Sequence, residues 1–374
     1  MKKQAFTLLA GILIGALLFG GITAIGSPVT AVPTPHHIFV DGKPVSVEAY
    51  AISGNNFFKL RDLLAAVDIG VWYEHDTKTV YIETDKPYDP DYQGPVEAQY
   101  KTENITVTGK RAAGIPSVLT IPGGDGPFPA VILCHGHGGS KDEAGGFVSL
   151  STALAKIGVA SIRMDFPGCG DSKEDFAADN NLTNMLDDVN SVKAFLAADE
   201  RINMNKLGII GYSMGGRIAM LTADETYKAT VLWAPAGTPG PSDMFTFMQL
   251  EDQAAFDALY AVAKKDGKAT YTAIFGFDQT LGLRWFDDML DLDPFAAFGG
   301  YSGDVLTLYG DEDIIITPEV ALAVSNVASG ANSSNLVEVK GADHGFGMYS
   351  DEPEITQAVI DSILAFIDTA LCSS

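Results

Sequence analysis

The chain has 374 residues, 47% of them hydrophobic, so it can bury a substantial core and, at about 150 residues per domain, is expected to form about two domains. Its 24 basic and 48 acidic side chains give a formal net charge of −24, which argues against nucleic acid or an anionic membrane surface as a partner, because both attract basic patches. Three cysteines without Cys-x-x-Cys spacing exclude a disulfide framework, a zinc ribbon and a thioredoxin-like site.

The first segment, residues 1–26, is typical of a signal peptide or a membrane anchor. Two lysines precede an uncharged apolar run from Ala5 to Ile25. Small residues offer cleavage sites, but the run is long for a signal-peptide core, so both cleavage and retention stay open. In either case we expect the rest of the chain to be secreted or held at the cell surface, with the proline-rich residues 27–35 as a spacer.

Residues 36–84 are predicted to form a small α+β domain with the order strands, helix, strands. We expect Asp41-Gly42 to form the hairpin turn between the first two strands, because these residues supply the positive φ angles that a tight primed turn needs. The expected elements are strands at 37–40 and 45–52, a helix within 57–67, and strands at 71–73 and 79–82. Prolines within residues 85–95 fix φ and remove donors, so we interpret that segment as a linker to a second domain.

Three phrases of this small domain resemble the copper amine oxidase N-terminal-like domain, a stalk module of exported bacterial proteins. They are Val40-Asp41-Gly42, the run from Asn55 to Asp62, and Thr79-Val80-Tyr81-Ile82. The resemblance implies a role in spacing or in attachment to the cell envelope. It implies no copper, and we interpret His36, His37 and His75 as solvent-facing, because they lack the spacing of metal ligands.

From Val96 onward, strands alternate with helices. The expected strands lie at 130–134, 160–164, 207–210, 229–233 and from 305 onward, and the expected helices at 147–157 and 186–197. This alternation predicts a mostly parallel sheet with helices on both faces and a ligand site at the carboxyl ends of the strands. Residues 236–301 are too long for a simple connection and rich in aromatic residues. We expect them to form an inserted cap, with most aromatic side chains in its own core and some lining an apolar acyl pocket.

The string Gly211-Tyr212-Ser213-Met214-Gly215 has the pattern Gly-x-Ser-x-Gly. The string alone is a weak signal, but it follows a strand that ends at Ile210 and precedes a helix expected to begin near Gly216. This strand–turn–helix context is typical of a nucleophile elbow, in which a side chain at either outer glycine would collide with neighbouring backbone. Ser213 is therefore the predicted nucleophile.

A serine hydroxyl needs a base and a carboxylate that orients the base, and in this context they follow the serine in the order acid, histidine. His344 is the only one of the six histidines that follows Ser213, so it is the predicted base. Three carboxylates after the strand that begins at Val305 are possible acids by spacing: Asp311, Glu312 and Asp313.

The oxyanion of an acyl transfer needs two backbone N–H donors, one of them from the residue after the nucleophile, here Met214, and the other from a loop after an early strand. The loop His135-Gly136-His137-Gly138-Gly139 follows the strand at 130–134. His135-x-His137 could also belong to an HxHxDH metal-binding string. However, Gly139 and Ser140 stand where that string needs Asp and His, so we expect no metal and no other cofactor.

The turn from Gly310 to Asp313, followed by an apolar run and Pro318, resembles the acid turn of α/β-hydrolases. This resemblance implies Asp313 as the acid, with Asp311 as the fallback. It also implies that His137, the residue after His-Gly, supplies the second oxyanion amide, and that His135 is a buried residue that braces the loop.

Residues 97–370 resemble more narrowly the cinnamoyl (feruloyl) esterase branch of the α/β-hydrolases. The segments that carry this resemblance are the run from Arg163 to Ser172, the helix 182–198, the elbow, and Leu290-Asp291-Leu292-Asp293. Two features depart from the branch: Tyr212 and Met214 stand where it often has His and Gln, and His137 stands where an aromatic or apolar residue is usual. These departures leave the identity of the substrate open, but they do not change the predicted reaction class.

Together these features predict an α/β-hydrolase fold with an inserted cap in residues 96–374 and a serine hydrolase that cleaves carboxylic esters through an acyl-enzyme. The expected substrates are aromatic (hydroxycinnamoyl or feruloyl) or short-chain acyl esters. Nothing in the sequence indicates an arginine pair that would bind a carboxylate, which disfavours a strongly anionic acyl group. A serine peptidase or thioesterase could use the same triad. A non-catalytic protein that binds the cell envelope is the alternative from another class, and the complete triad argues against it.

Overall fold

The computed structural model describes residues 32–33, 38–40, 43–45, 47–52, 55–74, 79–84, 86–90, 100–350 and 352–373. The chain divides into two units, residues 1–95 and residues 96–374, and each is described by itself. The expected signal peptide or anchor, His36, His37, His75 and the second half of the expected linker lie outside the described residues.

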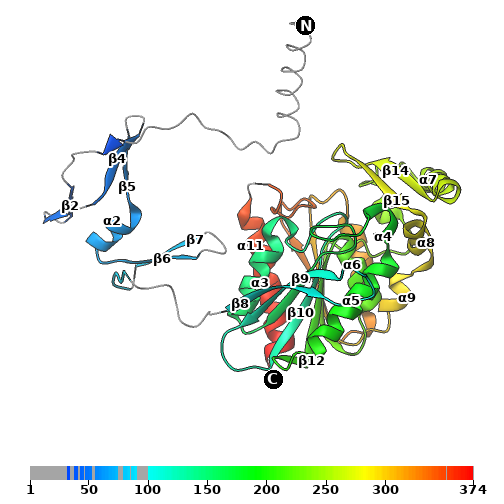
Figure 1. Ribbon diagram of the computed structural model, residues 1–374, viewed down its shortest axis with the longest axis horizontal. Coiled ribbons are helices and arrows are strands. Elements are labelled where there is room, and N and C mark those ends of the chain that lie inside the picture. Colours follow the sequence, from blue (N-terminus) through cyan, green and yellow to red (C-terminus); the bar gives the residue numbers. More distant parts are fainter. Residues whose placement is uncertain are drawn as a thin grey trace, which may run out of the picture. The chain divides into compact units, whose positions relative to one another are not determined.

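The described part of the first unit consists of short antiparallel strands and one helix (Figure 1). Its elements are β1 (Val32–Pro33), β2 (Ile38–Val40), β3 (Lys43–Val45), β4 (Ala49–Ile52), β5 (Asn55–Phe58), α2 (Leu60–Ala66), β6 (Gly70–Glu74) and β7 (Thr79–Glu83). β2 pairs with β3, β4 lies between β1 and β5, and β6 pairs with β7. The described part of this unit buries few large side chains, among them Leu64 and Val71.

Two predicted boundaries in the first unit are wrong. The strand expected at 45–52 is two strands, because β3 pairs with the preceding strand β2 whereas β4 pairs with the following strand β5. The helix expected within 57–67 begins only at Leu60, because Phe57 and Phe58 belong to β5, opposite Tyr50 and Ala49. Aromatic residues fit a pleated strand as well as a helix face, so periodicity alone could not separate the two states.

The second unit is built on an eight-stranded sheet with the order β17-β16-β13-β12-β10-β11-β9-β8. The strands are β8 (Tyr100–Val107), β9 (Ile115–Pro122), β10 (Phe128–Cys134), β11 (Ala160–Met164), β12 (Ile202–Tyr212), β13 (Tyr227–Trp233), β16 (Asp304–Gly310) and β17 (Ser333–Val339). All neighbours from β11 to β17 pair in parallel, and β8 and β9 add an antiparallel edge. The predicted mostly parallel sheet is confirmed.

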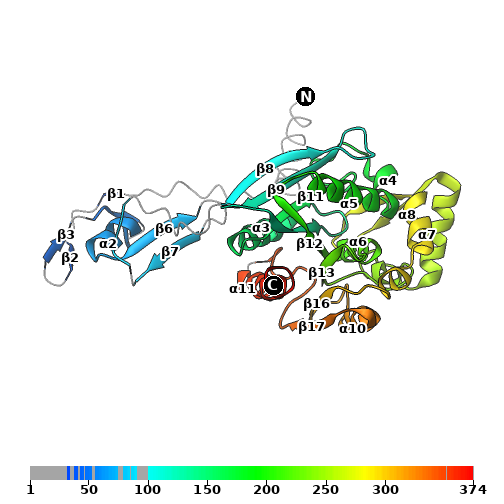
Figure 2. The ribbon, with the colours of Figure 1, turned by 90° about the horizontal axis from the view of Figure 1, so that it is seen from below.

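Helices cover both faces of this sheet (Figure 2). α3 (Gly146–Lys156) and α11 (Pro353–Ile367) pack against each other on one face, and α5 (Leu182–Ala197) and α6 (Met214–Thr222) pack against each other on the opposite face. α10 (Pro318–Val327) packs on β16 and β17. The central strand β10 is buried on both sides, with Val131, Ile132 and Leu133 fully covered, as is typical of parallel strands between two helix layers.

The last helix of the chain is unusually apolar. Together with the π-helical turn Asp368–Cys372 it forms a helix of 20 residues, long and apolar enough to cross a membrane by length and composition. Val359, Ile360, Ile363 and Ile367 of α11 are buried, and the helix contacts α3, β16 and β17. Its apolar side therefore belongs to the core of the second unit.

The register of the parallel strands brings three loops to one end of the sheet. Cys134 lies beside Gly211, so the loop after β10 and the turn after β12 leave the sheet together. Trp233 lies between Tyr212 and Leu308, so the segment after β16 leaves the sheet at the same end. The carboxyl ends of these strands are the expected place for a site in such a sheet.

Between β13 and β16 the chain forms a helical layer with one hairpin, drawn in yellow in Figure 1. It contains α7 (Gln253–Asp266), β14 (Lys268–Thr272), β15 (Asp278–Gly282), α8 (Leu283–Asp291) and α9 (Pro294–Phe298). We call residues 236–301 the cap. Its core is aromatic, with Phe256, Trp285 and Phe286 fully buried. α8 packs on α5, and β15 packs on the short helix α4 (Phe176–Asp179), so the cap is fixed to the sheet layer by its second half.

Candidate active site

Ser213 occupies a sharp turn between β12 and α6. Its backbone has φ 54° and ψ −117°, a conformation that non-glycine residues rarely adopt and that marks local strain. A Cβ on Gly211 would lie 2.1 Å from the carbonyl oxygen of Gly215, and a Cβ on Gly215 would lie 2.0 Å from that of Cys134. Both glycines are thus required by collisions with backbone. The helix begins directly at Met214, not near Gly216 as predicted, because the turn itself is complete in one residue.

The structure brings Ser213, His344 and Asp313 together. The imidazole Nε2 of His344 lies 3.0 Å from Oγ of Ser213, and its Nδ1 lies 2.7 Å from Oδ2 of Asp313. Since a carboxylate only accepts, Nδ1 carries the proton and Nε2 accepts the hydroxyl proton of the serine. This is the tautomer in which the histidine can act as a general base toward the serine.

Of the three carboxylates that spacing allowed, only Asp313 faces the histidine. Its Oδ1 accepts hydrogen bonds of 2.8 Å from the backbone N–H groups of both Ile315 and Ile316, so its rotamer is fixed and Oδ2 is left for His344. Asp311 points elsewhere and accepts from the N–H of Gly341 at 2.6 Å. Glu312 is exposed.

Tyr212 contacts both the backbone and the imidazole of His344. Its hydroxyl donates to the carbonyl oxygen of His344 at 2.5 Å, and its ring stacks on the imidazole at 5.4 Å between centroids. Burial raises the pKa of this phenol well above its usual value, so it stays a donor. The tyrosine that departs from the resembled esterase branch therefore holds the base segment in place.

Two amides at this site are without an acceptor. In the part of the chain that the structure describes, no hydrogen bond uses the backbone N–H of His137 or of Met214. Met214 is the first residue of α6, where the helix leaves its N–H groups unpaired and its dipole favours negative charge. His137 belongs to the loop that follows β10 and whose Gly136 lies against Ser213.

His135 braces this loop. Its Nδ1 donates to the carbonyl oxygen of Gly136 at 2.7 Å, and its Nε2 accepts from the N–H of Phe166 at 3.0 Å. Burial lowers the pKa of the imidazole, which keeps it neutral and able to make both bonds. Both ring nitrogens are engaged with backbone groups. Among the described residues, no group of three or more His, Cys, Asp or Glu side chains is placed to hold a metal ion.

The side chain of His137 connects the loop to the cap. Its Nε2 lies 2.8 Å from Oε1 of Gln279 on β15 and 3.2 Å from the hydroxyl of Tyr271 on β14. Phe176 and Phe247 meet the imidazole edge-on at 5.6 and 5.5 Å. Burial under the cap lowers its pKa to about 4, so the ring is neutral near pH 7 and donates from Nε2. The resemblance to α/β-hydrolases implied a role for the amide of this residue, but no signal in the sequence indicated that its imidazole binds the cap.

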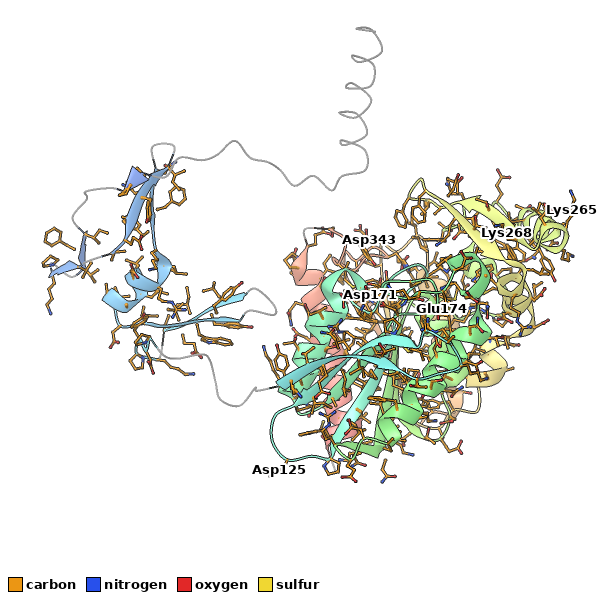
Figure 3. All side chains as sticks on the ribbon, viewed as in Figure 1. Asp125, Asp171, Glu174, Lys265, Lys268 and Asp343 are labelled. Atoms are coloured by element: carbon orange, nitrogen blue, oxygen red, sulfur yellow. The ribbon has the colours of Figure 1, made fainter. Side chains whose placement is uncertain are left out.

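A cavity of about 520 Å³ opens above Ser213 and His344, within the range of small-molecule sites. Its apolar wall comes from the cap and from the segment after Asp313, namely Met244, Phe247, Phe275, Phe277, Ile315 and Ile316. Glu143 and Asp343 are its acidic residues, and no lysine or arginine of the described chain lines it. Lys265 and Lys268 of the cap, both labelled in Figure 3, are exposed and lie on the outer part of the cap.

Three residues that line the cavity were missed by the sequence reasoning: Glu143, Gln279 and Tyr349. Glu143 ends the run Lys141-Asp142-Glu143, which is typical of an exposed loop. Gln279 and Tyr349 have no motif around them. Nothing in their local sequence separates them from surface residues, because their positions depend on segments far away in the chain.

Comparison with known proteins agrees with this architecture. A family model described as Alpha/beta hydrolase family matches residues 131–358. Esterase EstD of Thermotoga maritima is 31% identical over 183 residues, which are 46% of this chain and 39% of EstD, so the match spans well under half of that relative.

Solved structures share the fold. Est1E from Butyrivibrio proteoclasticus with ferulic acid bound has a TM-score of 0.57 and 22% identity, over 70% of this chain and 99% of that chain. A putative hydrolase from Agrobacterium vitis has a TM-score of 0.54 and 21% identity, over 72% and 99% of the two chains. The sheet order, the strained serine turn and the match over more than half of the chain lead to one conclusion: this protein belongs to the α/β hydrolase family.

Proposed function

We propose that this protein is a carboxylic ester hydrolase that works through an acyl-enzyme on Ser213. The observation that carries the proposal is the chain of contacts from Ser213 through His344 to Asp313 at the floor of the cavity. The two unpaired amides beside it supply what the chemistry needs for a developing negative charge. The match to an esterase, EstD, supports the same reaction class.

In the acylation step, Oγ of Ser213 attacks the carbonyl carbon of the ester while Nε2 of His344 takes the hydroxyl proton. The carbonyl oxygen becomes an oxyanion, and the amides of His137 and Met214 donate to it. His344, now an imidazolium held by Asp313, gives its proton to the leaving alcohol oxygen as the C–O bond breaks. An acyl-serine and a free alcohol result.

Deacylation repeats these roles with water. His344 takes one proton from a water molecule, whose oxygen attacks the acyl-serine, and the same two amides hold the second oxyanion. The proton then returns to Oγ of Ser213 as the acid is released. Asp313 accepts the Nδ1–H of His344 throughout, so Nε2 always faces the reacting atoms.

The cavity supports uncharged acyl groups of aromatic or short aliphatic kind. Phe247, Phe275 and Phe277 offer apolar and aromatic surface, and a volume of about 520 Å³ accommodates one substituted phenyl ring with its linker. The charged residues at the wall, Glu143 and Asp343, are acidic and disfavour an anionic acyl group. Hydroxycinnamoyl esters, which the resembled branch cleaves, fit this description.

Turnover of p-nitrophenyl esters, methyl ferulate, a thioester and a dipeptide amide by the purified wild type tests the proposal. We expect ester turnover that is lost in Ser213→Ala and kept in Ser334→Ala, a control serine on the edge strand β17. Failure of the wild type on every ester would contradict the proposal. Faster cleavage of the amide or thioester than of the esters would replace it with a peptidase or a thioesterase.

We further propose that the chain is exported and that residues 36–84 space the hydrolase unit from the cell envelope or attach it there. Support comes from the apolar N-terminal run and from the resemblance of the small domain to a stalk module. Fractionation of cells that produce the full chain tests this: we expect the protein outside the cytoplasmic membrane. Recovery of active protein from the cytoplasm would contradict it.

A further inference from the structure

Glu143 is a buried carboxylate close to the triad without a role in the reaction described above. It is 1% exposed, and no ion pair with a lysine or arginine is found for it in the described chain. Its two carboxylate oxygens are nevertheless engaged: Oε2 accepts from the backbone N–H of Gly136 at 2.8 Å, and Oε1 accepts from the hydroxyl of Tyr349. A buried carboxylate without a cation partner is costly, so its position calls for a functional reason.

The backbone that carries this side chain is strained. Glu143 and Ala144 have φ of 41° and 50°, both in the left-handed region, and Gly145 follows with φ 95°. The carboxylate also requires a glycine at position 139, because a Cβ there would lie 2.8 Å from Oε2 of Glu143. Strained non-glycine residues persist where surrounding contacts hold them, and they concentrate at functional sites.

The two groups that Glu143 binds belong to the two loops that the reaction needs. Gly136 directly precedes His137, whose amide faces the oxyanion in the proposed mechanism. Tyr349 lies five residues after His344, on the segment that carries the base. All of these residues line the same cavity. One carboxylate thus joins the loop after β10, which carries the oxyanion donor, to the segment after β17, which carries the base.

We propose that Glu143 is a positioning residue that fixes the oxyanion amide of His137 relative to Ser213 and His344, with Tyr349 as its second anchor. This inference rests on the proposed ester hydrolysis. Glu143 acts through the backbone of Gly136, the residue directly before His137, and not through contact with the reacting atoms. Oxyanion donors stabilise the transition state only when they are held in place before charge develops, so loss of the anchor lowers kcat more than it raises KM.

The test compares two Tyr–Glu hydrogen bonds of the same kind. Tyr349→Phe removes the hydroxyl donor at the site, and Glu143→Gln replaces one of its two acceptor oxygens with an amide group that only donates. Tyr309→Phe and Glu338→Gln make the same changes at a second Tyr–Glu bond of 3.0 Å, which joins β16 to the edge strand β17 and whose residues do not line the cavity. Tyr349 is 63% exposed, so Tyr349→Phe should fold normally even if Glu143→Gln does not.

Each variant is measured for kcat and KM with p-nitrophenyl acetate, for Tm, and for inhibition by an aryl trifluoromethyl ketone. The ketone forms a hemiketal oxyanion on the serine, so its affinity reports on the oxyanion donors. We expect kcat to fall by about 10- to 100-fold in Glu143→Gln and by about three- to tenfold in Tyr349→Phe, with weaker inhibition in parallel and KM within about twofold of the wild type. The control pair should stay at wild-type values.

Three results would overturn the inference: unchanged kcat and ketone inhibition in Tyr349→Phe, a loss that lies entirely in KM, or an equal loss in the control pair. The proposed function is judged separately by turnover of the wild type and its disappearance in Ser213→Ala. An active wild type with unaffected Glu143 and Tyr349 variants would therefore remove only the role of Glu143.

Discussion

The two sides of the cavity are held by different kinds of contact. On one side, Ser213 and Asp313 are fixed by their own turns, through backbone collisions at Gly211 and Gly215 and through the two N–H groups that Asp313 accepts. We call this the elbow side. On the other side, which we call the oxyanion side, the loop from His135 to Gly139 is held by side chains outside it, Glu143 seven residues after Gly136 and Gln279 on the cap.

This difference has a consequence for substitution. The elbow side depends on local geometry, so a single atom added or changed there should be severe. The oxyanion side shares its support among the cap, Glu143 and Tyr349, so each contact should contribute a smaller part. Division of support among several contacts also allows the cap to influence the proposed oxyanion donor, because Gln279 binds the side chain of His137.

The largest effect should follow from a change of one atom on the elbow side. Asp313→Asn turns the acceptor of His344 Nδ1–H into a group that can donate, which favours the wrong tautomer of the imidazole and should lower kcat by about 10⁴-fold. Steady-state kinetics with p-nitrophenyl acetate measure it. Asp311→Asn, two residues away in the same turn, is the control and should cost much less. The reverse order would assign the acid to Asp311.

A methyl group at the elbow should damage folding instead of chemistry. Gly215→Ala places a Cβ 2.0 Å from the carbonyl oxygen of Cys134, and relief of that collision should lower the free energy of unfolding by about 3 kcal/mol. Urea unfolding measures the loss. Gly300→Ala adds a methyl group where no atom lies within 4 Å and should change stability little. Equal unfolding curves for the two variants would show that the elbow tolerates side chains.

A contact on the oxyanion side should give a moderate effect. Gln279→Leu removes the acceptor of His137 Nε2–H and of the Tyr271 hydroxyl, and it should lower kcat by about tenfold as the loop loosens. Gln253→Leu, on an exposed part of the cap helix α7, is the matched control.

A double-mutant cycle shows whether Gln279 acts through His137. His137→Phe keeps the amide but removes the same hydrogen bond, so it should also lower kcat by about tenfold, and Gln279→Leu should cost almost nothing further in that background. An equal effect of Gln279→Leu in both backgrounds would mean that the cap supports the site without the imidazole.

The last expected effect is on stability instead of activity, through a dependence on pH. The pKa of His137 is about 4 in the folded protein, below the usual value near 6.5, so the unfolded chain binds more protons between these values. The contribution of His137 is therefore complete above about pH 6.5 and is lost as the pH falls toward 4. Urea unfolding at pH 7, 5.5 and 4.5 should show a shallower decline for His137→Phe than for the wild type. Parallel declines would mean that the imidazole titrates normally.

The sequence reasoning succeeded where a short segment carries the whole signal. The strand, turn and helix around Ser213 are contiguous, the base was the last histidine in the chain, and the apolar strands read as buried runs. The strands β8, β9 and β17 were not predicted: β17 begins Ser-Ser-Asn at the edge of the sheet, where little burial is required. The placement of Phe57 and Phe58 in β5 instead of a helix depended on pairing with β4.

By itself the sequence determined the elbow turn and the alternation of strands and helices, because those features rest on backbone sterics and periodicity within a few residues. It also left one candidate for the base, because His344 is the only histidine after Ser213. It left three acids open by spacing, and only the fold showed that Asp313 reaches the imidazole while Asp311 turns away. The partnership of His137 with Gln279, and of Glu143 with Tyr349, was decided by tertiary structure alone. The pairs His137–Gln279 and Glu143–Tyr349 are 142 and 206 residues apart, and a hydrogen bond between such residues exists only once the sheet has set the distance between their loops.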